Sequence, residues 1–271
     1  MSLYKITSQK LHQRRYAQSS IDNYLGYIAE FESKVGKHHS RLNSSDFQSY
    51  IDHYQFTSAS QQNVIISALK FAWEKALGKK YFKIDFTRPR KEKKLPKIID
   101  AELLATKIKA IPNLKHKAIL ALGLSCGLRI SEVVNLKWEH LDKEQNILNV
   151  VQSKGKKDRI CILNDDMILL LKQYWHTYKK IDTHLKKKEY VFVGQNKRAQ
   201  YSRSSIQGIV KKYITPKASF HLLRHTYATY ALDNGTEIKP LSISLGHKST
   251  KTTEIYHHTS KRSLRTIKQA M

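Results

Sequence analysis

The fold of this chain is indicated most clearly by one stretch, Ser219-Phe-His-Leu-Leu-Arg-His-Thr-Tyr-Ala-Thr-Tyr-Ala-Leu-Asp-Asn-Gly235. It predicts a helix, because a serine that can cap the N-terminus precedes it and Asn-Gly follows it. His221 and Arg224 are three residues apart, so we expect both on one face near the positive end of the helix, where an anion binds well. By itself, however, this spacing is expected by chance and is explained first by a solvated helix face, so residues elsewhere in the chain must decide between the two.

The next motif along the chain is Leu245-Gly-His-Lys-Ser-Thr250, followed by a helix predicted over residues 251–258. Its glycine permits a sharp turn that can place His247 in a cleft. The helix carries Tyr256. A lone tyrosine normally packs in the core or lies on the surface, as we expect for Tyr227 and Tyr230, so Tyr256 is favoured only by the motifs around it.

Two further basic residues, nearer the N-terminus, lie where predicted helices or strands begin or end. Arg129 begins a short helix after the apolar helix predicted over residues 113–124. Strands predicted over residues 146–152 and 158–163 flank a glycine-containing turn, and Lys154 lies on or beside that turn.

Together these residues provide two guanidinium groups, an ammonium, two imidazoles and a phenol. A metal-free enzyme would need such groups to hold a phosphate, protonate a leaving oxygen and supply a nucleophile. They are Arg129, Lys154, His221, Arg224, His247 and Tyr256.

The length of 271 residues predicts two domains. Residues 1–87 have the periodicity of a helical bundle, with helices over 19–34, 44–54 and 58–77. Residues 88–98 form a linker, and residues 99–271 form an α+β unit dominated by helices, with a further strand at 190–193. The linker is either a solvated tether or a strap that contacts DNA through its basic residues, which are Arg88, Arg90, Lys91, Lys93, Lys94 and Lys97.

The composition favours a polyanionic partner. Lysine and arginine total 49 against 22 acidic residues, a net charge of +27. Such a surplus is typical of proteins that bind nucleic acid or an anionic membrane, although a merely soluble basic protein is the alternative. The sequence has no long apolar run and no signal peptide, so we expect a soluble, intracellular protein without membrane contact.

Cysteine and histidine spacing gives little reason to expect a metal. Cys126 and Cys161 are predicted to be buried, reduced thiols, because no paired spacing links them. His221 and His225 are four residues apart but lack the glutamate of a metalloprotease helix. We therefore expect no metal and no cofactor.

Five blocks, in this order, resemble the tyrosine recombinases of the phage integrase family, in particular Xer-like enzymes and short phage or mobile-element integrases. They are Cys126-Gly-Leu-Arg-Ile-Ser-Glu-Val-Val-Asn-Leu136, Ser153-Lys-Gly-Lys-Lys-Asp-Arg159, His221-Leu-Leu-Arg-His-Thr-Tyr-Ala-Thr229, Leu245-Gly-His-Lys-Ser-Thr250 and Thr253-Glu-Ile-Tyr256. The resemblance implies a mainly α fold with a small β-sheet, made of an N-terminal helical core-binding (SAM-like) domain and an α+β catalytic domain.

The resemblance also implies a role for each residue of the set. Arg129 and Arg224 would clamp the scissile phosphate, and His221 and His247 would contact it. Lys154 would protonate the leaving 5′ oxygen. Tyr256 would be the nucleophile, and Glu132 would support Arg129 from one turn away.

The implied activity is site-specific recombination of double-stranded DNA at core sites through a 3′-phosphotyrosyl intermediate, without metal or ATP. By resemblance the enzyme acts as a homotetramer on two sites, with a possible directionality or DNA-bending factor, in the cytoplasm at the nucleoid. Integration or excision of phage or mobile DNA is the expected role, and dimer resolution and inversion are alternatives. A type IB-like nicking and closing enzyme and a non-catalytic DNA-binding protein are alternatives from other classes.

Overall fold

The computed structural model describes residues 1–80, 96–151, 158–181, 190–194, 200–247 and 249–256. It divides into two compact units, Met1–Lys93 and Lys94–Met271. The predicted linker lies outside the described residues up to residue 95, and with it Arg88, Arg90, Lys91, Lys93 and Lys94. The exact domain boundaries therefore stay a prediction.

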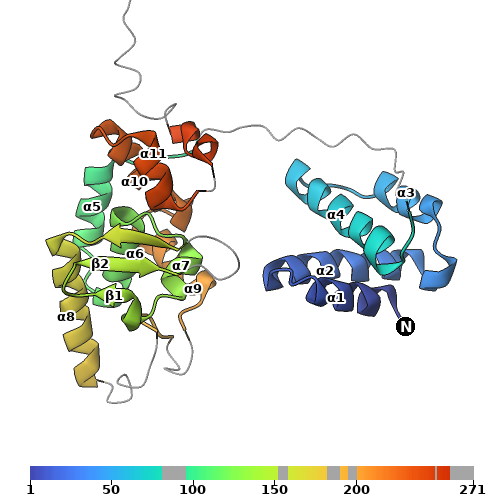
Figure 1. The fold of residues 1–271 in the computed structure, drawn as a ribbon, viewed down its shortest axis with the longest axis horizontal. Coiled ribbons are helices and arrows are strands. Elements are labelled where there is room, and N and C mark those ends of the chain that lie inside the picture. Colours follow the sequence, from blue (N-terminus) through green and yellow to red (C-terminus); the bar gives the residue numbers. More distant parts are fainter. Residues whose placement is uncertain (81–95, 152–157, 182–189, 195–199, 248, 257–271) are drawn as a thin grey trace, which may run out of the picture. The chain divides into compact units, whose positions relative to one another are not determined.

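The N-terminal unit is a helical bundle (Figure 1). It contains α1 Leu3–Gln13, α2 Gln18–Val35, the 3-10 turn η1 His39–Arg41, α3 Ser44–Asp52, α4 Ala59–Phe71 and the π-helical turn η2 Ala72–Ala76. Its core is rich in aromatic side chains, with the ring of Phe31 4.4 Å from that of Phe47, and Phe47 edge-on to Trp73 at 5.2 Å.

Local signals explain where two of these helices begin or end. Asn43 and Asp46 form a reciprocal capping box at the start of α3. Gly36 ends α2 in the left-handed conformation, at φ 65°. The sequence analysis did not predict α1, although Ser2 caps it locally by accepting a hydrogen bond from the backbone N–H of Lys5. A tertiary contact adds to this cap, since the Glu32 carboxylate accepts hydrogen bonds from the backbone N–H groups of Leu3 and Tyr4.

The second unit combines helices with one small sheet, so the predicted fold class, mainly α with a small β-sheet, is confirmed. Its elements are α5 Ala101–Lys109, α6 Leu114–Ser125, α7 Ile130–Val134, η3 Trp138–His140, β1 Leu141–Asp142, β2 Ile147–Val150, β3 Arg159–Ile162, α8 Asp165–Ile181, α9 Arg203–Tyr213, α10 Phe220–Asp233, α11 Ile238–Leu245, η5 Thr250–Thr252 and η6 Glu254–Tyr256. The antiparallel sheet has the order β1-β2-β3, with Leu148 opposite Cys161.

Two predicted elements differ in the structure. At residues 190–193 the expected strand is reduced to isolated bridges, from Lys137 to Tyr190 and from Val193 to Gln200. The helix expected over residues 251–258 is replaced, as far as residue 256, by the two short 3-10 turns η5 and η6. The hairpin tip predicted at residues 153–157, which includes Lys154, lies outside the described residues.

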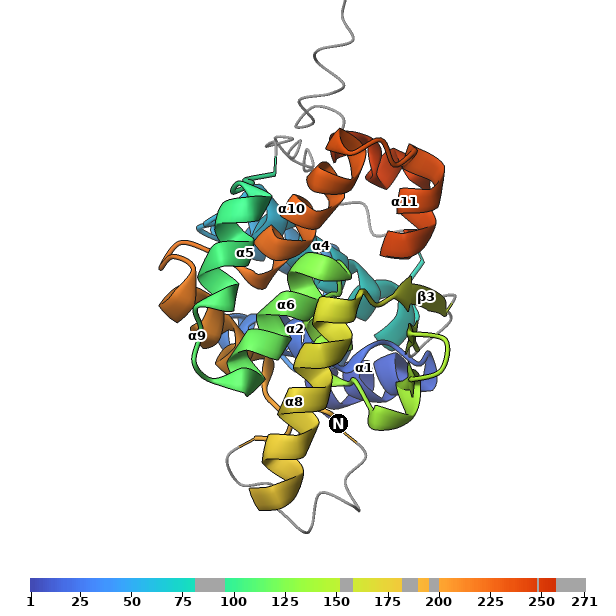
Figure 2. The ribbon, with the colours of Figure 1, turned by 90° about the vertical axis from the view of Figure 1, so that its left-hand side faces the viewer.

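The close packing of α10 on α6 positions the candidate site (Figure 2). Gly123 of α6 lies directly against Phe220 of α10, since a Cβ at this glycine would be 2.7 Å from the Phe220 ring. Both helices are buried along their shared face. As a result, Arg224 reaches the turn that follows α6, at Gly127.

The described part of the chain contains no helix long and apolar enough to cross a membrane. Cys126 and Cys161 are buried free thiols, as predicted.

Candidate active site

Arg224 is the centre of the candidate site. It is only 3% exposed, on the buried face of α10. Its Nη1 donates to the carbonyl of Gly127, and its Nη2 donates to the carbonyl of Leu245, 2.6 Å away. Burial and the charge of Arg129 lower the pKa of Arg224 to about 10, so the guanidinium stays protonated at neutral pH. These carbonyls fix the plane of a buried positive charge.

Arg129 lies at the N-terminus of α7, at the helix junction expected from the sequence. Its backbone N–H and its Nη1 donate to the two carboxylate oxygens of Glu132, at 2.7 and 2.8 Å. Its Nη2 donates to the carbonyl of Gly246 at 3.1 Å. The carbonyls of Leu245 and Gly246 thus hold Arg224 and Arg129, so the end of α11 brings the two arginines to the same place.

Arg159 is a third arginine that organises the site, and the sequence motifs did not predict a role for it. It is 5% exposed, and its guanidinium makes a bidentate pair with Glu132, with both bonds 2.8 Å long. Its Nε donates to the carbonyl of Ser244 at 2.6 Å. The signal available in the sequence was an arginine at an inward position of the alternating strand Arg159–Ile162.

Glu132 therefore carries its negative charge among positive ones. Burial alone would raise the pKa of its carboxyl, but the hydrogen bonds and charge of Arg159, together with the bonds from Arg129, lower the pKa to about 2. The carboxylate is ionised at any pH near neutrality.

His247 lies between Arg224 and the last turns of the described chain. Its Nε2 is 3.0 Å from Arg224 Nη2, and its Nδ1 is 2.8 Å from the hydroxyl of Thr253. Because a guanidinium only donates, Nε2 must accept and Nδ1 carries the proton. Burial, followed by the charge of Arg224, lowers the pKa of His247 to about 4, so the ring is neutral at pH 7.

Tyr256 is buried in the same region, at 2% exposure. Its hydroxyl lies 2.9 Å from Nδ1 of His225, the residue that follows Arg224 on α10. Burial raises the pKa of the Tyr256 phenol, while the charges of Arg224 and Arg129 act in the opposite direction. The two arginines thus act electrostatically on the phenol.

His221 occupies an exposed position one turn before Arg224 and His225. Its ring centroid is 6.2 Å from that of His225. Burial of part of the ring, then the charges of Arg224 and Arg129, lower the pKa of His221. Hence five of the six predicted site residues gather around α10 and the end of α11, and the sixth, Lys154, lies outside the described residues.

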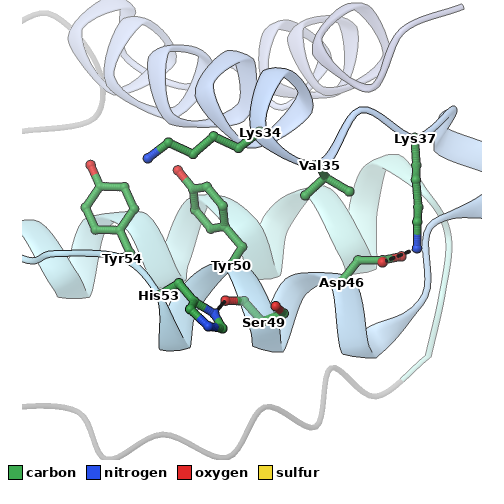
Figure 3. A pocket seen from close by; sticks show the side chains of 8 residues that line it. All are labelled: Lys34, Val35, Lys37, Asp46, Ser49, Tyr50, His53 and Tyr54. Carbon is green, nitrogen blue, oxygen red and sulfur yellow. Dashed lines mark hydrogen bonds and ion pairs between the residues drawn. The ribbon is translucent and has the colours of Figure 1, made fainter.

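Two hollows on the protein surface are lined mainly by residues outside the group around Arg224. In the N-terminal unit a surface hollow is lined by Lys34, Lys37, Asp46, Tyr50 and Tyr54 among others (Figure 3). Lys34 Nζ lies 5.0 Å from the ring centre of Tyr54, and Lys37 pairs with Asp46 at 2.6 Å. In the second unit Lys97, a predicted DNA contact, lines a cleft beside Lys217 and His225.

No group of three or more histidine, cysteine, aspartate or glutamate side chains that could hold a metal ion occurs among the residues the structure describes.

Comparison with known proteins covers both units. The phage integrase family model matches residues 92–263, and the model of the phage integrase N-terminal SAM-like domain matches residues 3–82. Tyrosine recombinase XerA of Pyrococcus horikoshii is 32% identical over 218 residues, which are 75% of this chain and 70% of that protein.

Two solved structures are also similar. A crystal structure of a XerA recombinase has a TM-score of 0.56 at 28% identity, covering 97% of this chain and 95% of that one. The XerH site-specific recombinase, solved bound to a palindromic difH substrate in a post-cleavage complex, has a TM-score of 0.71 at 19% identity, covering 95% and 83%.

Proposed function

This chain belongs to the phage integrase family of tyrosine recombinases, which are site-specific DNA recombinases, and we propose that it cleaves and rejoins DNA through a covalent bond between Tyr256 and a 3′ phosphate. One observation supports the proposal most strongly. The buried Tyr256 phenol lies in the electrostatic field of Arg224 and Arg129. Neighbouring backbone carbonyls hold the guanidinium groups of these two arginines in place.

Arg129 and Arg224 bind the non-bridging oxygens of the scissile phosphate in this mechanism. The arginines are oriented before DNA arrives, because Glu132 and three carbonyl groups already hold them. Fixed positive charge of this kind stabilises the additional negative charge of the phosphorane in the transition state. His247, whose Nε2 already contacts Arg224, is placed to contact the same phosphate.

Tyr256 attacks the phosphorus, and the 5′ oxygen leaves. A phenol with an ordinary pKa near 10 costs about 4 kcal/mol to ionise at neutral pH, so the site must assist the reaction. We assign protonation of the leaving oxygen to Lys154, in the segment of the sequence between β2 and β3. The phosphotyrosyl bond retains the energy of the broken linkage, so ligation to a new strand requires no ATP.

Double-stranded DNA is the proposed substrate. The net charge of +27 supports a polyanionic partner, and the similar XerH recombinase was solved with its DNA site bound. We propose that the protein acts on two core sites as a homotetramer and integrates or excises phage or mobile DNA. Inversion and dimer resolution use the same chemistry on other arrangements of sites.

A strand-joining assay tests this function. A duplex selected for binding from a random-sequence library is end-labelled and incubated, in EDTA, with an unlabelled duplex that carries the same site and a longer arm. The parent protein should transfer the label to the longer product, and Tyr256→Phe should bind the DNA equally well without transferring it. If bound duplexes are nicked and closed but never exchanged, a type IB-like enzyme replaces the recombinase. Binding with no cleavage at all would leave a DNA-binding protein.

A further inference from the structure

One imidazole contacts the hydroxyl of Tyr256. His225 Nδ1 lies 2.9 Å from the phenol oxygen, and the two ring centroids are 5.6 Å apart. His225 follows Arg224 directly on α10, so the imidazole that contacts the Tyr256 hydroxyl and one arginine of the phosphate clamp lie on the same helix. His225 is neither of the two histidines expected to contact the phosphate.

The other polar groups of the site are less suited to accept the phenol proton. His247 has both ring nitrogens engaged, one by Arg224 and one by Thr253. The carboxylate of Glu132 is held by two arginines, and its pKa of about 2 makes it a very weak base. His221 is exposed and lies one turn before His225 on α10.

We propose that His225 is a catalytic residue, the general base that takes the phenol proton as Tyr256 attacks the phosphate. This inference rests on the proposed role of Tyr256 as the nucleophile. The geometry meets the first requirement of a general base, since the nitrogen is already within hydrogen-bond distance of the oxygen whose proton it accepts.

The electrostatics of the free site keep this base neutral. Burial, then the charges of His221 and Arg224, lower the pKa of His225 to about 4, so its ring is uncharged and can accept a proton at pH 7. A phosphodiester bound between Arg129 and Arg224 adds a negative charge close to the ring, and a negative charge raises the basicity of an imidazole. His225 therefore becomes a stronger base when DNA occupies the site.

The proposed step balances as follows. The bond from Tyr256 Oη to phosphorus forms, and the bond from phosphorus to the 5′ oxygen breaks. The phenol proton moves to His225 Nδ1, and the 5′ oxygen takes a proton from Lys154. The reverse steps on ligation return both protons. His225 also lines an open cleft with Lys97 and Lys217, so the imidazolium can exchange its proton with water.

The test measures removal of the Tyr256 proton separately from protonation of the leaving 5′ oxygen. Cleavage is measured under single-turnover conditions, at saturating protein, on a duplex whose scissile 5′ oxygen is replaced by sulfur, because a thiolate leaves without a proton. His225→Asn keeps a hydrogen-bond acceptor but cannot take up a proton. It should cleave roughly 100-fold or more slowly than the parent, with unchanged DNA affinity.

Two further readouts distinguish proton transfer from packing. The His225→Asn rate should rise almost tenfold per pH unit between pH 7 and 9, as more Tyr256 ionises without a base, and the parent rate should rise less. The other titratable or charged groups around His225 that influence this profile are His221, Arg224, His247, Lys97 and Lys217. Added imidazole should partly restore cleavage by His225→Ala.

His116→Asn is the matched control. His116 is a half-buried histidine of the same unit whose ring nitrogens lie 3.4 and 3.5 Å from the hydroxyls of Tyr213 and Tyr201. This variant should cleave within about threefold of the parent.

The outcomes separate the inference from the function on which it rests. If His225→Asn cleaves within threefold of the parent, or is slow without the steeper pH profile and without imidazole rescue of His225→Ala, His225 is not the base. If Tyr256→Phe still forms a covalent adduct, the proposed nucleophile itself is wrong.

Discussion

At the scale of single residues, Glu132 links the arginines of the candidate site. Its carboxylate contacts Arg129, which the sequence indicated, and Arg159, which the sequence did not. Arg159 in turn reaches the carbonyl of Ser244, next to the carbonyls that hold Arg224 and Arg129. The orientation of the phosphate clamp therefore depends on a buried ion pair that contains neither the nucleophile nor the general acid.

Arg159→Ala should be strongly destabilising. It leaves part of the buried Glu132 charge without its partner, and removing one member of a buried ion pair typically costs about 3–5 kcal/mol. The free energy of unfolding in urea gives the measurement. The control, Lys109→Ala, breaks an exposed pair with Asp166 at 3.8 Å and should cost less than about 1 kcal/mol. Equal losses in the two variants would show that the Arg159 pair is not important for the fold.

Protonation of the site histidines should make stability depend on pH. The pKa values of His225 and His247 are lowered to about 4 in the folded protein, below the ordinary value of 6.5. Below pH 6.5 the unfolded chain takes up protons on these histidines, whereas the folded protein does not until the pH approaches 4. Proton uptake by the unfolded chain therefore lowers the free energy of unfolding as the pH falls from 6.5 towards 4, and above pH 6.5 this loss is absent. Unfolding measured from pH 7 to 4 should show this decline, and His247→Gln should make it shallower. An unchanged slope in that variant would contradict the assignment.

At the scale of elements, the turn after α6 determines where Arg224 binds. Gly127 has a φ of 58°, and a Cβ there would lie 2.6 Å from the ring of Tyr227. Its carbonyl accepts the Nη1 bond of Arg224. The turn therefore needs glycine both for its left-handed backbone and for the close approach of Tyr227.

Gly127→Ala should lower the free energy of unfolding by about 2–4 kcal/mol, because backbone strain adds to overpacking. It should also slow DNA cleavage. Gly36→Ala is a matched control, since its φ is 65° but nothing lies within 4 Å of an added Cβ. That variant should lose only the backbone component, about 1 kcal/mol. If both variants lose the same amount, the contact with Tyr227 is unimportant.

Most helices could be predicted from the sequence because periodicity and caps specify them locally. The periodicity predicted α2 and α10 almost to the residue. Ser219 occupies the N-cap position of α10 as predicted, but its side chain makes no capping hydrogen bond. Helix α1 was missed although Ser2 caps it locally, and the further contact of its first residues with Glu32, nearly thirty residues away, leaves no local pattern in the sequence. The segment at residues 190–193 has strand-like residues, but only isolated bridges form there.

The residues of the candidate site were likewise predictable only in part. The motifs predicted Arg129, His221, Arg224, His247 and Tyr256 as a group, and the structure brings these residues to one region. Arg159 and His225 acquire their contacts through tertiary packing between elements distant in sequence, at separations of 27 and 31 residues. The alternation of the strand Arg159–Ile162 indicates that Arg159 points inward, but spacing along the chain does not identify the partner of either residue.

At the scale of the whole molecule, the positive charge provides a prediction about DNA binding. Each phosphate contact adds about 0.9 to the slope of log affinity against log salt concentration. If the linker contacts DNA, replacing Arg88, Arg90 and Lys91 with glutamine should reduce the slope by up to about 3. The control variant replaces the exposed Lys109, Lys143 and Lys172 with glutamine and so removes the same amount of charge elsewhere on the surface. A similar change in both triple variants would mean that only net charge matters and that the linker is a tether.

Tyr256 is the residue proposed to form the covalent bond to DNA. The most direct test incubates the protein with a nicked duplex of its selected site in EDTA, digests the adduct and locates the attached nucleotide by mass spectrometry. We predict a nucleotide on the peptide that contains Tyr256 and no adduct with Tyr256→Phe. A nucleotide on another residue, or no adduct on DNA that the protein demonstrably binds, would contradict the account.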